Sequence, residues 1–166
     1  VRPVQSELPH GSEANGDELW IGRVVQDGVS QDGVSHAGKT RPAFGGLNYS
    51  HEGKAACVRD GYDVLKVARA AYRWEAAREG GIPAGAVIVG GGVGGGEVYV
   101  ARGSCGGGVH PGEALAGVGC VVEYGGRGVT LGEYEVLVLT DGGSAEWVAC
   151  ANGILPEAAE EAAAGG

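Results

Sequence analysis

The sequence contains one unit twice, and this repeat limits the fold more than any other feature. Three pairs of segments correspond in the same order along the chain: residues 17–23 (DELWIGR) and 96–102 (GEVYVAR), 36–38 (HAG) and 110–112 (HPG), and 62–65 (YDVL) and 134–137 (YEVL). The second member of each pair follows the first by 79, 74 and 72 positions, and the larger first offset reflects a pentapeptide, QDGVS, that occurs twice in succession at residues 26–35. The chain is therefore predicted to be two copies of a unit of about 75 residues.

The repeat leaves one segment unmatched. Trp74 precedes the second unit and Trp147 follows it 73 positions later, but no such tryptophan precedes the first unit. We therefore expect the C-terminal segment to supply a missing strand to the first unit, either within the same molecule or in a neighbouring chain. The predicted organisation is a first repeat at residues 1–72, a second repeat at 73–146 and a C-terminal segment at 147–166.

The high glycine content favours strands and turns over helices. The chain has 35 glycines, and each glycine inside a helix costs roughly 1 kcal/mol relative to alanine. We predict an all-β fold, in which two tandem pseudo-symmetric repeats of short antiparallel strands interlock into one compact domain. The predicted strands are residues 19–25, 47–50, 62–67, 73–76, 82–91, 98–102, 120–124 and 134–140.

Four other segments complete the sequence-based assignment. Residues 67–79 are rich in alanine and favour helix by propensity, but their repeat partner is short, so a strand is the preferred interpretation. Residues 26–38 are predicted to form a turn-rich loop that the duplicated pentapeptide lengthens. Residues 1–12 are expected to be an edge strand or an arm, and residues 156–164 a short helix or a frayed tail.

Charge and hydropathy exclude several classes of partner. The net charge is −9 and the basic residues are scattered, whereas nucleic-acid binding needs a basic surface; we therefore expect no nucleic-acid partner. Since no run approaches the ~20 apolar residues of a transmembrane helix, we also expect no membrane insertion. The sequence starts at Val1 and contains no methionine, so a processed or partial chain is the simplest interpretation.

The cysteines give little evidence of a metal site. Cys57, Cys105, Cys120 and Cys150 lack CxxC spacing and do not occupy equivalent positions in the two units. Zinc is therefore not expected on this spacing, and we predict no metal and no cofactor. The even number of cysteines is compatible with disulfides and with buried free thiols. An extracellular location is favoured over a cytoplasmic one.

No motif in the sequence indicates an enzyme. Residues 90–96 are almost entirely glycine, but a strand follows them, whereas a dinucleotide-binding fingerprint precedes a helix. There is no Gly-x-Ser-x-Gly elbow, and Ser104 and Cys105 lie in a glycine-rich segment without a partnered His and Asp pattern. We therefore predict a protein without catalytic residues.

The order and spacing of these motifs resemble the DM-nine repeat family, which includes mannose-binding invertebrate lectins built from two tandem repeats. The matching segments are Trp74 with residues 81–83 (GIP), then 98–102 (VYVAR), 110–112 (HPG), 120–126 (CVVEYGG) and 134–137 (YEVL). The resemblance implies an all-β fold of two interlocked repeats. It also implies a mannose site that uses an acidic residue before the first strand and a lysine after the proline-glycine turn, and these positions fall on Glu13 and Lys39.

Glu13 and Lys39 are thus the core of the predicted carbohydrate-binding site, with Asn15 and His36 as neutral contacts. A carboxylate accepts hydrogen bonds from sugar hydroxyls and an ammonium donates to sugar oxygens, and such charge-assisted bonds are the stronger kind. A solvated ion pair is the alternative interpretation for the two charges. Trp20 could offer an apolar face to a sugar ring, although core packing is the favoured interpretation for the tryptophans.

The match departs from the family pattern at several positions. Aspartate is usual where Glu13 stands, and proline is usual where Ala37 stands. In the second repeat the lysine position is Glu113, and the acidic segment has become glycine-rich at residues 91–95. We therefore expect the second sugar site to be lost or altered.

Together these observations predict a non-enzymatic carbohydrate-binding protein, a lectin, with mannose-containing glycans or glycoproteins as its partners. The alternative is a structural repeat protein that assembles into oligomers or fibres by strand exchange and keeps a vestigial sugar site. We expect a homo-oligomer, either a dimer or an open assembly. An adaptor in trafficking or in innate immunity is a third alternative, which only the family resemblance implies.

Overall fold

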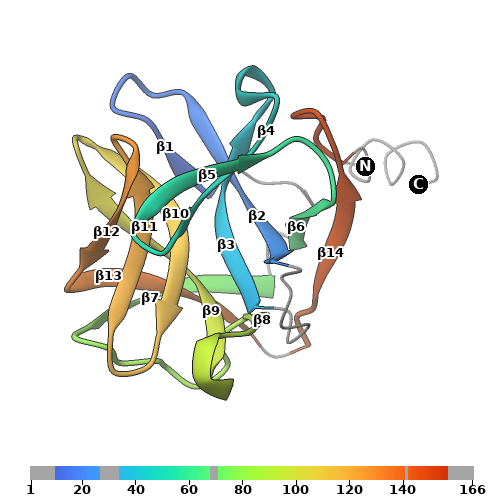
Figure 1. Cartoon of the computed structure of the whole chain (residues 1–166). Coiled ribbons are helices and arrows are strands. Elements are labelled where there is room, and N and C mark those ends of the chain that lie inside the picture. The colour runs from blue at the N-terminus through green and yellow to red at the C-terminus, as the bar shows by residue number, and fades with distance from the viewer. Residues whose placement is uncertain (1–9, 27–33, 68–70, 141, 157–166) are drawn as a thin grey trace.

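The computed structural model describes residues 10–26, 34–67, 71–140 and 142–156, which form one antiparallel sheet of 14 strands (Figure 1). The first-repeat strands are β2 (Glu18–Gln26), β3 (Val34–Arg41), β4 (Gly46–His51), β5 (Lys54–Val58) and β6 (Tyr62–Val67). The second-repeat strands are β9 (Glu97–Cys105), β10 (Gly108–Leu115), β11 (Gly119–Tyr124), β12 (Arg127–Leu131) and β13 (Glu133–Leu139). The remaining elements are β1 (Gly11–Ser12), β7 (Tyr72–Arg78), β8 (Ile88–Gly91), β14 (Ala145–Cys150) and the 3-10 turns η1 (Pro42–Phe44) and η3 (Val93–Gly95).

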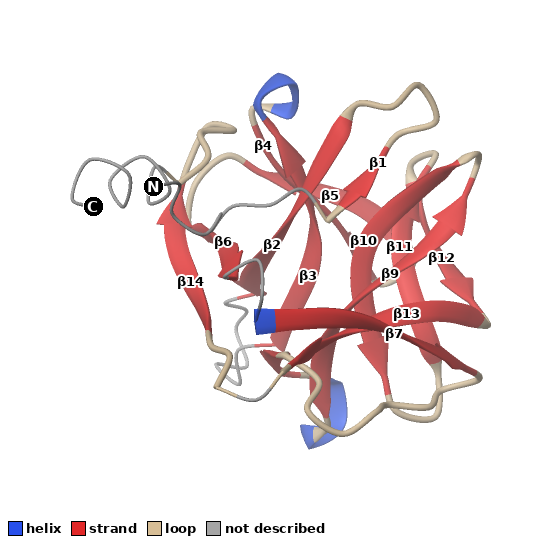
Figure 2. Cartoon of the chain, turned by 180° about the vertical axis from the view of Figure 1, so that it is seen from behind, coloured by secondary structure: helices blue, strands red, loops and turns tan. Residues whose placement is uncertain are grey.

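The order of the strands in the sheet has a pseudo-twofold symmetry. It runs β14-β6-β2-β3-β4-β5-β12-β11-β10-β9-β13-β7, so each strand stands opposite its repeat equivalent when the order is read from the two ends. The halves meet where β5 pairs with β12 at Lys54 and Arg127. The sheet is thus one continuous structure built from both repeats, as Figure 2 shows from behind.

The strand that follows each repeat in the sequence becomes the outer strand of the other repeat. β7, which comes after the first repeat, pairs with β13 of the second, and Trp74 stands opposite Leu137. β14, which comes after the second repeat, pairs with β6 of the first, and Trp147 stands opposite Leu65. The unmatched C-terminal tryptophan therefore lies in a strand that pairs with the first repeat of the same chain.

The core lies between the two repeats and contains side chains from both. Its central cluster includes Ile21 and Leu65 from the first repeat and Val100 and Leu137 from the second, and all four are fully buried. Smaller clusters lie on either side, one within each repeat. Because apolar burial stabilises a fold in proportion to the area removed from water, the shared cluster binds the two repeats into one folding unit.

The all-β fold of two interlocked repeats is confirmed, and most of the predicted strands are present. β6 occupies the predicted range, and the alanine-rich segment forms β7 rather than a helix because it completes the sheet beside β13. Among the described residues, no helix is long and apolar enough to cross a membrane. Of the edge strand or arm expected at residues 1–12, only the end is described, and it forms β1 at Gly11–Ser12. Most of the duplicated pentapeptide at 26–35 and all but the first residue of the tail expected at 156–164 lie outside the described residues.

Three local predictions were wrong. Residues 34–38 belong to β3 rather than to a loop, and Pro111-Gly112 lies within β10 rather than in a turn. Among the described residues, β10 pairs with β1 only at Val109 and with β11 only from Glu113, so on that side of the strand no described strand pairs with Pro111, which is why a proline is tolerated there. Only residues 88–91 of the strand predicted at 82–91 form β8, while β5 and β12 were not predicted at all.

Candidate functional site

The candidate site is built where β3 and β10 lie side by side in the middle of the molecule (Figure 1, Figure 2). Gly38 and Gly112 occupy equivalent positions in these two strands and allow the neighbouring strands to approach. A Cβ atom at Gly38 would meet the backbone of Asn48, and one at Gly112 would meet the backbone of Val121. The flanking side chains are consequently drawn into the interior, and β3 is buried from Ser35 to Thr40.

The close approach creates two polar contacts between the repeats. Lys39 of β3 contacts His110 of β10, and His36 of β3 contacts Glu113 of β10. Since His36 corresponds to His110 and Lys39 corresponds to Glu113 in the repeat, the pseudo-twofold symmetry relates the two contacts. The two repeats differ at one of these positions, where the first has the cationic Lys39 and the second has the anionic Glu113. The two contacts are therefore equivalent in position but opposite in charge.

The first cluster is centred on the ammonium of Lys39, a residue that is only 4% exposed. Nζ donates a hydrogen bond to Nδ1 of His110 over 2.8 Å and lies 3.7 Å from Oε1 of Glu123. Burial lowers the pKa of Lys39 from its ordinary value, while the charges of Glu123 and Glu13 oppose that shift. Burial and the Lys39 charge together lower the pKa of His110.

The loop that carries Glu13 lies against this cluster. The backbone carbonyl of Glu13 accepts from the N–H of Gly16, and the backbone N–H of Glu13 donates to the carbonyl of Asp17. These two bonds close a tight turn. The turn packs on the tip of the β9–β10 hairpin, where a side chain at Gly108 would meet the backbone of Ser12 and Glu13. Glu13 is close enough for its charge to offset part of the lowering of the pKa values of both Lys39 and His110.

Asn15 is held within the same turn rather than toward Lys39. Its side-chain oxygen accepts from the backbone N–H of Asp17 over 2.9 Å, and its amide nitrogen donates to the Asp17 carboxylate over 3.1 Å. Asp17 also pairs with Arg41 at 3.0 Å. The exposed Asn15 therefore fixes the shape of the loop that presents Glu13.

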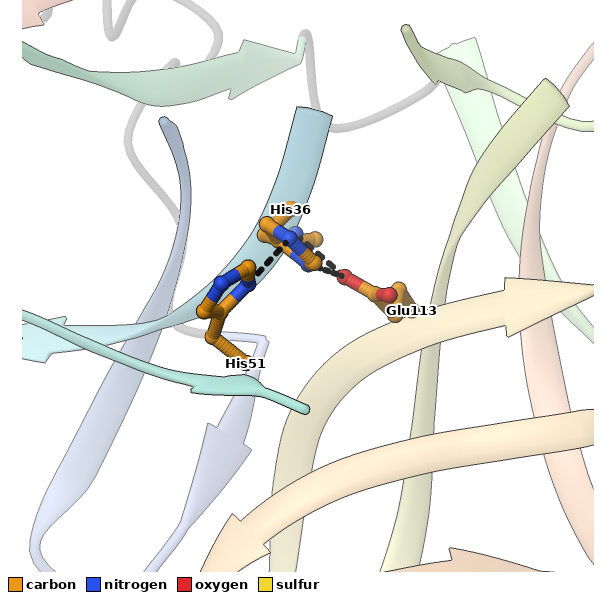
Figure 3. A network of polar contacts seen from close by, with 4 residues as sticks. His36, His51 and Glu113 are labelled. Carbon is orange, nitrogen blue, oxygen red and sulfur yellow. Dashed lines mark hydrogen bonds and ion pairs between the residues drawn. The ribbon is translucent and has the colours of Figure 1, made fainter. Parts of the chain in front are cut away.

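The second cluster is a row of three side chains, His51, His36 and Glu113 (Figure 3). Nδ1 of His51 lies 3.2 Å from Nε2 of His36, and Nδ1 of His36 lies 3.3 Å from Oε1 of Glu113. The same carboxylate oxygen accepts the backbone N–H of Ala37 over 2.9 Å. His36 and Glu113 are buried, and His51 is the member that reaches the surface.

The four predicted site residues are thus divided between two places. Lys39 is the centre of the first cluster, and Glu13 and Asn15 lie on the loop beside it, whereas His36 belongs to the second cluster with Glu113. The predicted site did not include His110, Glu123, Tyr124 and His51, which the fold brings to these clusters. Tyr124 and His51 occupy equivalent repeat positions at the ends of β11 and β4, and this correspondence was the available signal.

The tryptophans have structural roles in the part of the chain described. The Arg102 guanidinium lies 4.0 Å from the centroid of the Trp74 ring and donates to Glu135 over 2.8 Å. The equivalent Arg23 lies 4.5 Å from the Trp147 ring and donates to Asp63 over 2.9 Å. Trp20 packs against the apolar cluster of the first repeat. These contacts attach the outer strands β7 and β14 to their host repeats.

Two surface hollows lie beside the outer face of β9 and β13. The larger, of about 740 Å³, is lined by residues that include Ala77, Arg102, Leu131 and Tyr134. The smaller, of about 410 Å³, also borders Arg102 and extends to Gly16 of the Glu13 loop. Arg102 is already neutralised by Glu135, so the charge between the two hollows is satisfied without a ligand.

Comparison with known families identifies the repeat. The family model described as the DM9 repeat matches residues 13–120 and again residues 94–166, which together span almost the whole chain. No curated protein matches the sequence.

Proposed function

Because the chain belongs to the DM9 repeat family, a non-enzymatic family of carbohydrate-binding type, we propose that it is a lectin for mannose-type glycans. The first cluster is the proposed binding site, with Lys39 and Glu13 as its principal contacts. The observation that supports this assignment best is the buried ammonium of Lys39, which lies among His110, Glu123 and the Glu13 loop. Both side chains that contact this cation, His110 and Glu123, come from the second repeat, so the site depends on how the two repeats meet.

The hydrogen-bonding capacity of the cluster suits a polyol. An ammonium has three N–H donors, of which Lys39 gives one to His110 and directs another toward Glu123. We assign the third to a sugar oxygen, while the carboxylates of Glu13 and Glu123 accept from neighbouring hydroxyls. Vicinal hydroxyls of a pyranose both donate and accept, so they complement this alternation of one cation and two anions.

Tyr124 extends the proposed site with an aromatic surface. Its ring lies 5.2 Å from that of His110 and 5.9 Å from Nζ of Lys39, measured to the Tyr124 ring centroid. The residue is 37% exposed, so part of the ring remains open to a ligand. The apolar C–H face of a sugar can pack on such a ring while its hydroxyls reach the charged groups.

The test is a calorimetric titration of the chain with mannose and oligomannose. Wild type is expected to bind, and both Glu13→Gln and Lys39→Met are expected to weaken binding by about 10- to 100-fold, since hydrogen bonds to charged groups contribute about 1.5–3 kcal/mol. The exposed Glu97 and Lys54 supply the matched controls, Glu97→Gln and Lys54→Met. Folded wild type that does not bind, or variants that bind as well as the controls, would refute the proposal.

Assembly by strand exchange is the competing function. In this chain β14 already pairs with β6 through six residue pairs, so exchange would require that strand to leave its own repeat. The intramolecular pairing therefore favours the lectin proposal over an assembly that depends on β14. Oligomers that form through other surfaces are compatible with both functions and would add avidity to a weak sugar site.

A further inference from the structure

The second cluster, which the sugar proposal leaves unused, has the arrangement of a supported pair of metal ligands. The Glu113 carboxylate accepts from the backbone N–H of Ala37 and lies against Nδ1 of His36 (Figure 3). Because an ionised carboxylate has no proton to give, the proton in this contact belongs to Nδ1 of His36. Nε2 of His36 then carries a lone pair, and it faces Nδ1 of His51 across 3.2 Å.

We propose that Nε2 of His36 and Nδ1 of His51 bind a divalent transition-metal ion such as Zn²⁺. Imidazole nitrogens bind zinc at about 2.0–2.1 Å. For two nitrogens 3.2 Å apart, bonds of that length place the nitrogen–metal–nitrogen angle at about 100–106°, close to the tetrahedral value. The spacing that allows one imidazole to donate to the other therefore also allows both to bind one ion.

Glu113 and Tyr49 hold His36 in the orientation that the ion requires. A metal-binding histidine usually donates its second ring N–H to a carboxylate or carbonyl, which fixes its tautomer and increases its basicity. Glu113 supplies that carboxylate from the other repeat. The Tyr49 ring stacks on His36 at a centroid distance of 5.6 Å and an interplanar angle of 27°, so the imidazole is fixed from its face as well as from its edge.

The surroundings of the two nitrogens suit a cation. Glu113 occupies the position in the second cluster that Lys39 occupies in the first, because the two residues are equivalent in the repeat. The second cluster therefore has a buried negative charge where the first has a buried positive one. Lys54, which stands opposite His51 across β4 and β5, is exposed and can keep its ammonium in water. His51 has a side chain 36% exposed, which gives an ion access from solvent.

The protein supplies two of the ligands, and water completes the coordination. Among the described residues, no group of three or more His, Cys, Asp or Glu side chains is arranged to hold a metal ion, so Glu113 acts through His36 rather than on the ion itself. Imidazole suits zinc, copper and nickel, whereas calcium and magnesium prefer oxygen ligands. The site is accordingly selective for late transition metals.

The proposal is tested by calorimetric titration with ZnCl₂ after chelator treatment, in a Cys57→Ser background that removes an exposed thiol able to bind zinc. One equivalent of Zn²⁺ is expected to bind. His51→Gln should weaken binding by more than tenfold, and Glu113→Gln by about 10- to 100-fold. The matched control is Glu97→Gln, since Glu97 is exposed on β9 and contacts neither histidine; the affinity of this variant for Zn²⁺ should change by less than twofold.

Electron paramagnetic resonance of the Cu²⁺-loaded wild type provides a readout that does not depend on any variant folding. Two imidazole nitrogens should couple to the ion. Absence of zinc binding, zinc binding unchanged in His51→Gln, or a copper spectrum without imidazole coupling would each overturn the proposal. Mannose titrations of His51→Gln separate this site from the proposed sugar site, because the variant should lose the metal and keep the sugar.

Discussion

Replacing Gly38 by alanine tests whether close strand approach at the centre of the molecule sustains both fold and site. The added methyl would lie 2.8 Å from Cβ of Tyr49 and nearer still to the backbone oxygen of Asn48. Ordinary contacts begin at about 3.4 Å, so the Tyr49 contact alone would require β3 and β4 to separate by about 0.6 Å, and the nearer Asn48 oxygen would require more. Gly112 is the pseudo-symmetric position, where a methyl would lie 2.9 Å from Cγ1 of Val122 and closer to the backbone of Val121.

Overpacking of a well-packed interior costs about 1–3 kcal/mol, and we expect the upper part of that range because backbone atoms cannot rotate away. For a chain of this size, about 3 kcal/mol lowers the melting temperature by roughly 6–12 °C. The assay is thermal unfolding followed by circular dichroism on Gly38→Ala and Gly112→Ala. The control is Gly132→Ala, since nothing lies within 4 Å of a Cβ atom there. Equal melting temperatures for Gly38→Ala and Gly132→Ala would refute the packing argument.

Two further predictions concern His10 and β14. Burial, reinforced by the Arg102 charge, lowers the pKa of His10 to about 3 from 6.5, so the unfolded chain binds more protons between these values and stability should fall by up to about 5 kcal/mol as pH decreases across that window. Urea unfolding from pH 7 to pH 4 should show a smaller loss in His10→Phe than in wild type, and identical pH dependence would contradict the assignment. Ending the chain at Thr140 removes β14 and leaves β6 as an open edge beside the central core, so the truncated chain should melt lower and self-associate in light scattering. An unchanged melting temperature and mass would mean that β14 is dispensable.

Much of the fold could be predicted from the repeat because equivalent positions have equivalent surroundings. The correspondence between Trp74 and Trp147 in the repeat was sufficient to expect an extra strand at the C-terminus. It also identified the alanine-rich β7 as a strand despite its helix propensity. β5 and β12 were not predicted because their patterns lack long apolar alternation: both lie at the junction between the repeats, where most of their residues are partly or fully exposed. β3 was mistaken for a loop because its glycine resembles a turn signal, whereas Gly38 serves close packing between strands.

The sequence alone determined that the chain is a duplicated all-β unit of the DM9 repeat type, whereas Glu13 and Lys39 as a sugar site were an expectation from the family resemblance. The tertiary structure decided what each charged side chain faces. Lys39 and His110 are 71 positions apart, and His36 and Glu113 are 77 apart, so only the meeting of β3 and β10 makes them neighbours. Their division into one cluster around a buried ammonium and one around a buried carboxylate has a physical cause: a buried charge needs a partner, and the contacts of Lys39 and Glu113 come from the other repeat.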